Sequence, residues 1–149
     1  MKRTRVKAKD VNKLLGAYGV ALSKKDAVEI LEGHYKVIVV NGEPSFFYFE
    51  DKLIPTLKYL QQHDILPKII VDMGAVKFVV NGADIMRPGI TEIDTSVRKD
   101  EFIVVVDENN KKALCVGIAL LSYEEMNNSS TGKSVKNIHY VGDELWNDY

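Results

Sequence analysis

The chain has 149 residues, of which 46% are hydrophobic and 28% are charged, a balance that excludes a disordered protein. This length suits one large domain or two small ones. No apolar run is long enough to span a bilayer, and no apolar segment follows the cations of the first ten residues as a secretory signal requires. The single cysteine, Cys115, excludes an internal disulfide and fits a reducing compartment, so we expect a cytoplasmic protein.

The formal net charge of −1 hides an uneven distribution along the chain. The first nine residues contain five Lys or Arg and no acid. Residues 1–67 carry 11 Lys or Arg against 8 Asp or Glu, whereas residues 68–149 carry 9 against 13. Proteins that bind nucleic acid without reading its sequence present a basic face. Any such face in this chain must therefore be local, or be shared with the N-terminal half.

Two short helices are predicted near the N-terminus, after a basic tail. The first runs from Asp10 to about Leu15, where the apolar residues have helical spacing. The second follows Ser23, which forms a weak capping box with Asp26, and ends at Gly33. Its buried side would consist of Ala27, Ile30 and Leu31.

A β-hairpin is predicted next, because Asn41-Gly42 is the strongest short signal for a tight turn. Its strands are residues 35–40 and the aromatic run Phe46 to Phe49. Side chains alternate across a strand, so one pair of these aromatics is expected in the core and the other on the surface as a contact patch. A helix with Pro55 in its first turn should follow, and Pro67 marks the candidate domain boundary.

The second half of the chain, residues 68–149, is predicted to contain short strands around one small helix. This pattern is typical of a compact barrel-like β domain. Strands are expected at residues 68–71, 102–106, 113–121 and 138–141, the last pairing with Leu145-Trp146. Residues 122–126 begin a short helix and residues 127–133 form a polar loop.

The segment from Asp72 to Ile90 contains three glycines, a Pro-Gly turn and two isolated cations. Asp72 is suited to cap the N-terminus of a helix, and Gly82 is suited to end one. A buried strand is the alternative, since the valines of this segment favour strands. The cap residues at both ends favour the helix.

The residues required by common enzyme motifs are missing. Gly132-Lys133-Ser134 has the end of a phosphate-binding loop, but Asn127 stands where that loop needs its first glycine. The three histidines are far apart, and Cys115 lies within an apolar strand, where a thiol behaves as a small buried hydrophobe. We therefore expect no catalysis, no metal and no cofactor.

Three blocks of the second half resemble the PUA domain, the RNA-binding module of pseudouridine synthases and archaeosine transglycosylases. They are DMGAVKFVVNGADIMRPGI (72–90), ALCVGIALLS (113–122) and IHYVGDELW (138–146). The resemblance extends to the malignant-T-cell-amplified-sequence family of translation factors through NGEPSFFYF (41–49), IPTLKYL (54–60) and ILPK (65–68). It implies an α+β chain in which an N-terminal pre-PUA domain, residues 1–67, is packed on a PUA pseudobarrel, residues 68–149.

The resemblance also implies where RNA would lie: against the short helix, the loop after it and the last strand. The positions that correspond are Gly74, Lys77, Asn81, Arg87, Gly89 and Trp146, with Lys133 and Lys136 extending the surface. Arg87 is suited equally to a bidentate phosphate contact and to an exposed loop. The simpler interpretation of Trp146 is that it packs in the core. The simpler interpretation of Lys133 and Lys136 is that they lie on the solvated surface. Lys2, Arg3 and Arg5 are phosphate contacts or part of a disordered arm.

These observations predict a non-catalytic RNA-binding protein of translation, which binds tRNA or the small ribosomal subunit during initiation or recycling. In the family that the chain resembles, the eukaryotic protein pairs with density-regulated protein to remove deacylated tRNA from the small subunit. The compact chain looks more like archaeal members. Two alternatives stay open: a protein-interaction module that docks on a ribosomal protein or translation factor, and an accessory factor in tRNA or rRNA modification.

Overall fold

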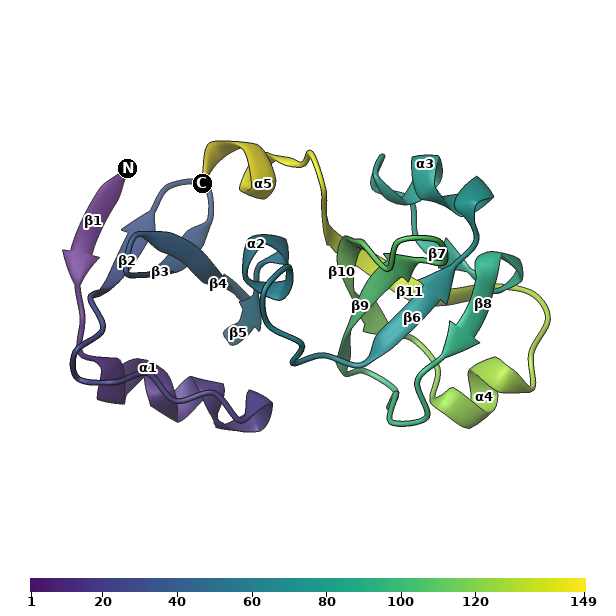
Figure 1. The fold of residues 1–149 in the computed structure, drawn as a ribbon, viewed down its shortest axis with the longest axis horizontal. Coiled ribbons are helices and arrows are strands. Elements are labelled where there is room, and N and C mark those ends of the chain that lie inside the picture. Colours follow the sequence, from purple (N-terminus) through teal and green to yellow (C-terminus); the bar gives the residue numbers. More distant parts are fainter. The chain divides into compact units, whose positions relative to one another are not determined.

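The computed structural model describes all residues, 1–149, and divides them into two compact units, Met1–Ile65 and Leu66–Tyr149. The N-terminal unit contains one antiparallel sheet in the order β1-β2-β3-β4-β5, with a helix against one face (Figure 1). Its elements are β1 (Lys2–Arg5), α1 (Ala8–Leu15), η1 (Gly16–Tyr18), β2 (Val28–Glu32), β3 (Lys36–Val40), β4 (Glu43–Phe49), β5 (Lys52–Pro55) and α2 (Leu57–Leu60).

The C-terminal unit is a nearly closed mixed sheet, a pseudobarrel, in the order β7-β11-β10-β9-β6-β8. Only the β6–β9 pair is parallel. Its elements are β6 (Lys68–Val71), η2 (Met73–Ala75), α3 (Val76–Val79), β7 (Ile85–Met86), η3 (Arg87–Gly89), β8 (Ile90–Ile93), β9 (Phe102–Asp107), β10 (Ala113–Ala119), α4 (Tyr123–Asn127), β11 (Lys133–Tyr140) and α5 (Glu144–Asp148). The predicted α+β class with a pseudobarrel is confirmed. No helix of the protein combines the length and the apolar character needed to cross a membrane.

Several local predictions are confirmed by the backbone. Asn41 and Gly42 both have positive φ, +50° and +85°, and join β3 to β4 as a tight hairpin turn. Strand β6 has the predicted bounds, and β9 and β10 differ from theirs by one or two residues. Helix α4 begins with a complete capping box between Ser122 and Glu125. Each of these signals depends only on residues close together in the chain.

The predicted second helix, with Ala27, Ile30 and Leu31 on its buried side, is wrong. Residues 28–32 form strand β2, which pairs with β1 on one side and β3 on the other. Ser23 and Asp26 do form the expected local bond, from Ser23 N–H to Asp26 Oδ2 at 2.8 Å, but it closes a turn. Pairing with β1, which is more than twenty residues away, and with the neighbouring β3 outweighs a weak cap signal.

The basic N-terminal arm is also ordered, as strand β1. Pro55 ends strand β5, and the helix after it begins only at Leu57, where Thr56 is the N-cap. Leu145 and Trp146 form helix α5 and not a strand, because the side chain of Asp143 accepts from Trp146 N–H and starts a helix there.

The aromatic run does not leave an exposed pair. Phe46 and Phe47, neighbours on opposite faces of β4, are both buried, and Tyr48 and Phe49 are half-buried. Phe46 packs in the core under α1, together with Val11, Leu15 and Ile38. The contact patch expected on this strand is therefore absent.

Tyr18 links the segment after α1 to the sheet. Its hydroxyl donates to Leu53 O at 2.7 Å, and burial raises the pKa of Tyr18 to about 12 from 10.0. The neutral hydroxyl of Tyr18 therefore contributes to the free energy of unfolding in full below about pH 10. This contribution is lost as the pH rises through about 12.

We expect Tyr18→Phe to lower the free energy of unfolding by about 1 kcal/mol at neutral pH, because the buried carbonyl of Leu53 loses its donor. The difference from wild type should shrink between about pH 10 and about pH 12. Urea unfolding of both proteins across this range measures it. Tyr48 and Tyr59, whose pKa values burial also raises, are present in both proteins and cancel. A difference that does not change with pH would contradict the expectation.

Candidate nucleic-acid interface

The short helix predicted after Asp72 is present. The carboxylate of Asp72 accepts from Ala75 N–H at 2.9 Å, so the turn η2 begins as a capped helix and continues into α3. Gly82, with φ +91°, ends it in the left-handed conformation that glycine adopts without penalty. The alternative of a buried strand is wrong here.

The outer side of this helix exposes an aromatic ring beside a cation. Phe78 is 57% exposed, whereas its neighbour Val79 is buried. The ammonium of Lys77 lies 5.1 Å from the centre of the Phe78 ring. Phe78 was not among the predicted site residues, because an aromatic within VKFVV reads as core. Helical geometry was the available signal, since a buried Val79 turns the preceding side chain outward.

The loop η3 lies against the first turn of the helix. Gly89 O accepts from Asp72 N–H at 2.9 Å, and a Cβ on Gly89 would lie 3.3 Å from that of Ala75. Arg87 is half-buried: its Nε donates to Met126 O at 2.7 Å and its Nη1 to Ile90 O at 3.1 Å. This guanidinium therefore links the loop to α4 through Met126 O and to the start of β8 through Ile90 O.

Strand β11 adjoins the same region. Lys133 pairs with Asp84 at 3.0 Å, and Arg87 N–H donates to Gly132 O at 2.8 Å. Although burial opposes ionisation of Asp84, bonds from Asn137 N–H and from Lys133 hold the pKa of this carboxyl below its usual value. The charge of Lys136 acts on Asp84 in the same direction. The two lysines of β11 thus border an acidic residue.

Not all the predicted site residues come together. One connected region of the C-terminal unit contains Gly74, Lys77, Asn81, Arg87, Gly89, Lys133 and Lys136. Helix α5, which contains the half-buried Trp146, lies well apart from α3 (Figure 1). Lys2, Arg3 and Arg5 belong to the N-terminal unit, and Arg3 pairs there with Glu29 at 2.9 Å.

The thiol of Cys115 and the His139–Asp143 pair could in principle take part in catalysis, but the thiol and His139 are buried parts of the fold. Cys115 is fully buried, and burial, with a smaller effect of the Asp84 charge, raises the pKa of its thiol far above its usual value. His139 Nδ1 lies 2.9 Å from Asp143 Oδ2, inside the protein. Burial opposes the ionisation of Asp143, yet bonds from His139 and from the N–H groups of Trp146 and Tyr140 lower its pKa. This pair therefore fixes the start of α5.

Comparison with known proteins agrees with this architecture. The family described as "PUA domain" matches residues 67–141, and a "Domain of unknown function (DUF1947)" matches residues 5–63. A solved structure of a hypothetical protein from Pyrococcus horikoshii superposes with a TM-score of 0.86 at 32% identity, over 97% of this chain and 98% of that one.

Three relatives in sequence cover most of the chain. An uncharacterized protein of Methanocaldococcus jannaschii is 47% identical, over 85% of this chain and 79% of its own length. Malignant T-cell-amplified sequence 1 of Rattus norvegicus is 39% identical, over 84% and 72%. Translation machinery-associated protein 20 of Saccharomyces cerevisiae is 36% identical, over 85% and 75%. The chain therefore belongs to the malignant-T-cell-amplified-sequence family of PUA-domain proteins.

Proposed function

We propose that this protein binds RNA in the cytoplasm as a non-catalytic accessory factor of translation, with tRNA or the small ribosomal subunit as its target. The PUA domain and the names of the relatives support an RNA-binding role associated with translation. The single observation that carries the proposal is the exposed pair Lys77 and Phe78 on the short helix of that domain.

An exposed ring beside a cation suits an unpaired nucleotide. Every base has a face that stacks on an aromatic side chain, and a neighbouring ammonium attracts the phosphate that belongs to it. Gly74 in η2 is exposed and has no side chain of its own that would keep a ribose away from the backbone. Lys136, exposed on β11, extends the positive charge along the strand.

The acidic balance of the C-terminal half limits how strongly this surface holds RNA. Residues 68–149 carry 9 Lys or Arg against 13 Asp or Glu, so few phosphates are neutralised. The logarithm of the association constant should therefore fall linearly with the logarithm of the salt concentration. The slope should be only a few, about 0.7 for each phosphate contacted on a single strand. Such an affinity fits a factor that acts on a ribosome together with a partner protein.

We expect Phe78→Ala to weaken binding of a labelled single-stranded RNA about tenfold, because one stacked base loses its platform. Lys77→Gln should weaken it less and lower the salt slope by about 0.7. Fluorescence anisotropy against salt measures both effects. The matched controls are Leu14→Ala, another exposed apolar residue, in α1, and Lys99→Gln, an exposed lysine outside this surface.

Unchanged affinity in the Phe78 and Lys77 variants would overturn this surface as the RNA site. If the full chain bound no RNA at low salt, docking on a ribosomal protein or translation factor would replace the proposal. A partner retained by the immobilised protein from a nuclease-treated extract would then identify that interaction.

A further inference from the structure

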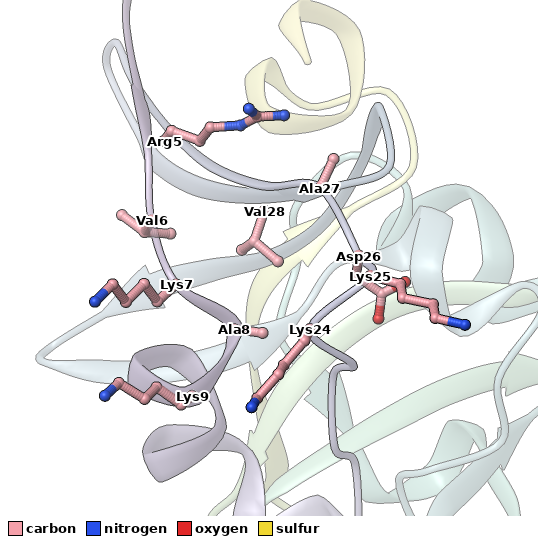
Figure 2. Close-up of a pocket in the computed structure, with 10 residues that line it drawn as sticks. All are labelled: Arg5, Val6, Lys7, Ala8, Lys9, Lys24, Lys25, Asp26, Ala27 and Val28. Atoms are coloured by element: carbon pink, nitrogen blue, oxygen red, sulfur yellow. The ribbon is translucent and has the colours of Figure 1, made fainter.

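The N-terminal unit contains a positively charged pocket that lies outside the PUA domain. Its volume is about 590 Å³, and two segments that are distant in sequence form its walls (Figure 2). Residues 5–9 run from the end of β1 into α1, and residues 24–28 lead into β2. The lining contains five cations: Arg5, Lys7, Lys9, Lys24 and Lys25.

None of these five cations is neutralised within the protein. All five are exposed, and none forms an ion pair with a carboxylate. The lining has one acid, Asp26, whose oxygens accept from Asn41 Nδ2 at 2.9 Å and Ser23 N–H at 2.8 Å. These bonds lower the pKa of Asp26, which stays ionised and ties the turn together. The lining therefore carries a formal charge of +4, in a chain whose total is −1.

The arrangement of the cations suits a chain of phosphates. Val6 packs towards the core between Arg5 and Lys7, and Figure 2 shows the guanidinium of Arg5 and the ammonium of Lys7 on opposite sides of this segment. Lys24 and Lys25 project from the facing segment (Figure 2). Like charges that lie close together without a partner repel one another and destabilise the folded protein. A bound polyanion would neutralise them and release its own counterions, which favours binding.

The lining is poorly suited to a protein partner. Protein interfaces are rich in large apolar and aromatic side chains at their centre. Here the apolar residues are Val6, Ala8, Ala27 and Val28, all small and all at least half-buried. A lysine ammonium is a point charge on a flexible stem and attracts a phosphate without a fixed geometry. The pocket should therefore bind a nucleic-acid backbone without distinguishing its bases.

We infer that this pocket is a second RNA-contacting site, one that holds the phosphate backbone of a single strand independently of its sequence. The inference rests on the proposed RNA-binding function and adds a contact in the N-terminal unit. Arg3, paired with Glu29, is not part of it. The site assigns a role to the family segment described only as a domain of unknown function.

The test compares two triple variants of the full chain. Lys7→Gln, Lys24→Gln and Lys25→Gln together should weaken binding of labelled oligouridylate about tenfold at about 50 mM salt, and should lower the salt slope by about 2. The matched control removes the same charge outside the pocket, through Lys13→Gln, Lys36→Gln and Lys52→Gln. The melting temperature of the pocket variant should equal or exceed that of wild type, since its three lysines are exposed and unpaired and their mutual repulsion is removed.

The outcomes separate this inference from the proposed function. Losses in both the pocket variant and the Lys77 and Phe78 variants support both sites. A loss in the Lys77 and Phe78 variants alone overturns the pocket, and a loss in the pocket variant alone overturns the PUA surface. No RNA binding by wild type overturns both. If polyglutamate at equal charge shifts the amide resonances of residues 5–9 and 24–28 as RNA does, the pocket is a site for an acidic protein segment and the inference is wrong.

Discussion

Replacing Gly117 with alanine is expected to lower the free energy of unfolding of the C-terminal unit by about 3 kcal/mol. A Cβ at this position would lie 2.4 Å from Val135 Cγ1 and 2.7 Å from the backbone oxygen of Lys136, in the adjacent strand β11. The backbone cannot move aside as a flexible side chain would. The register of β10 and β11 also shifts between Val116 and Gly117, so the bulge depends on this close approach.

Calorimetry should show the transition of this unit about 12 °C or more lower, given its size of 84 residues. The control is Gly16→Ala. Gly16 has a helical φ of −57°, and a Cβ there would meet no atom within 4 Å. Alanine at this position should leave stability unchanged or raise it by several tenths of a kcal/mol. Equal stability of the Gly117 variant and wild type would mean that the two strands are not as close as the structure has them.

The second large effect is expected at Asn137, whose amide joins the candidate nucleic-acid interface to the pseudobarrel. Its Nδ2 donates to Val79 O and to Ala83 O, both at 3.0 Å, at the end of α3. Asn137→Asp places a carboxylate against both carbonyl oxygens at almost unchanged volume. We expect a loss of about 3 kcal/mol at neutral pH, because two donors are removed and a half-buried charge is left facing two carbonyl oxygens.

The pH dependence distinguishes this mechanism from a general loss of packing. Carbonyl oxygens and burial favour the neutral acid, so the folded state should raise the pKa of the new carboxyl above its unfolded value. The defect relative to wild type should then shrink as the pH is lowered and the carboxyl becomes protonated. Asn81→Asp is the matched control, since Asn81 is exposed and its Nδ2 reaches only Lys77 O. A defect that stayed constant with pH would contradict the proposed repulsion.

The candidate interface could be located from sequence, but the roles of its residues could not. Arg87 was as well suited to a phosphate as to an exposed loop, and only the position of α4 showed that it binds Met126 O. Phe78 looked like core, although its side chain faces outward and lies beside Lys77. Exposure and hydrogen bonding depend on which element packs against each side chain, and local spacing carries little of that information.

The pocket of the N-terminal unit could not be predicted from the sequence either. The first nine residues were visibly basic, but the sequence did not connect them with Lys24 and Lys25. That connection required β2 to be a strand beside β1, whereas the local signals favoured a helix. Pairing of β1 with β2 brings the two basic segments together across more than twenty residues of chain.

The sequence by itself determined the family, the pseudobarrel and every feature that a few neighbouring residues can encode. The Asp72 cap, the Asn41-Gly42 turn and the apolar strand β10 are of this kind, because their hydrogen bonds or burial follow from local composition. Only the tertiary structure decided that residues 28–32 are a strand, that Phe78 is exposed and that five cations share one pocket. Those outcomes depend on partners far away in the chain, whose pairing energy outweighs local preference.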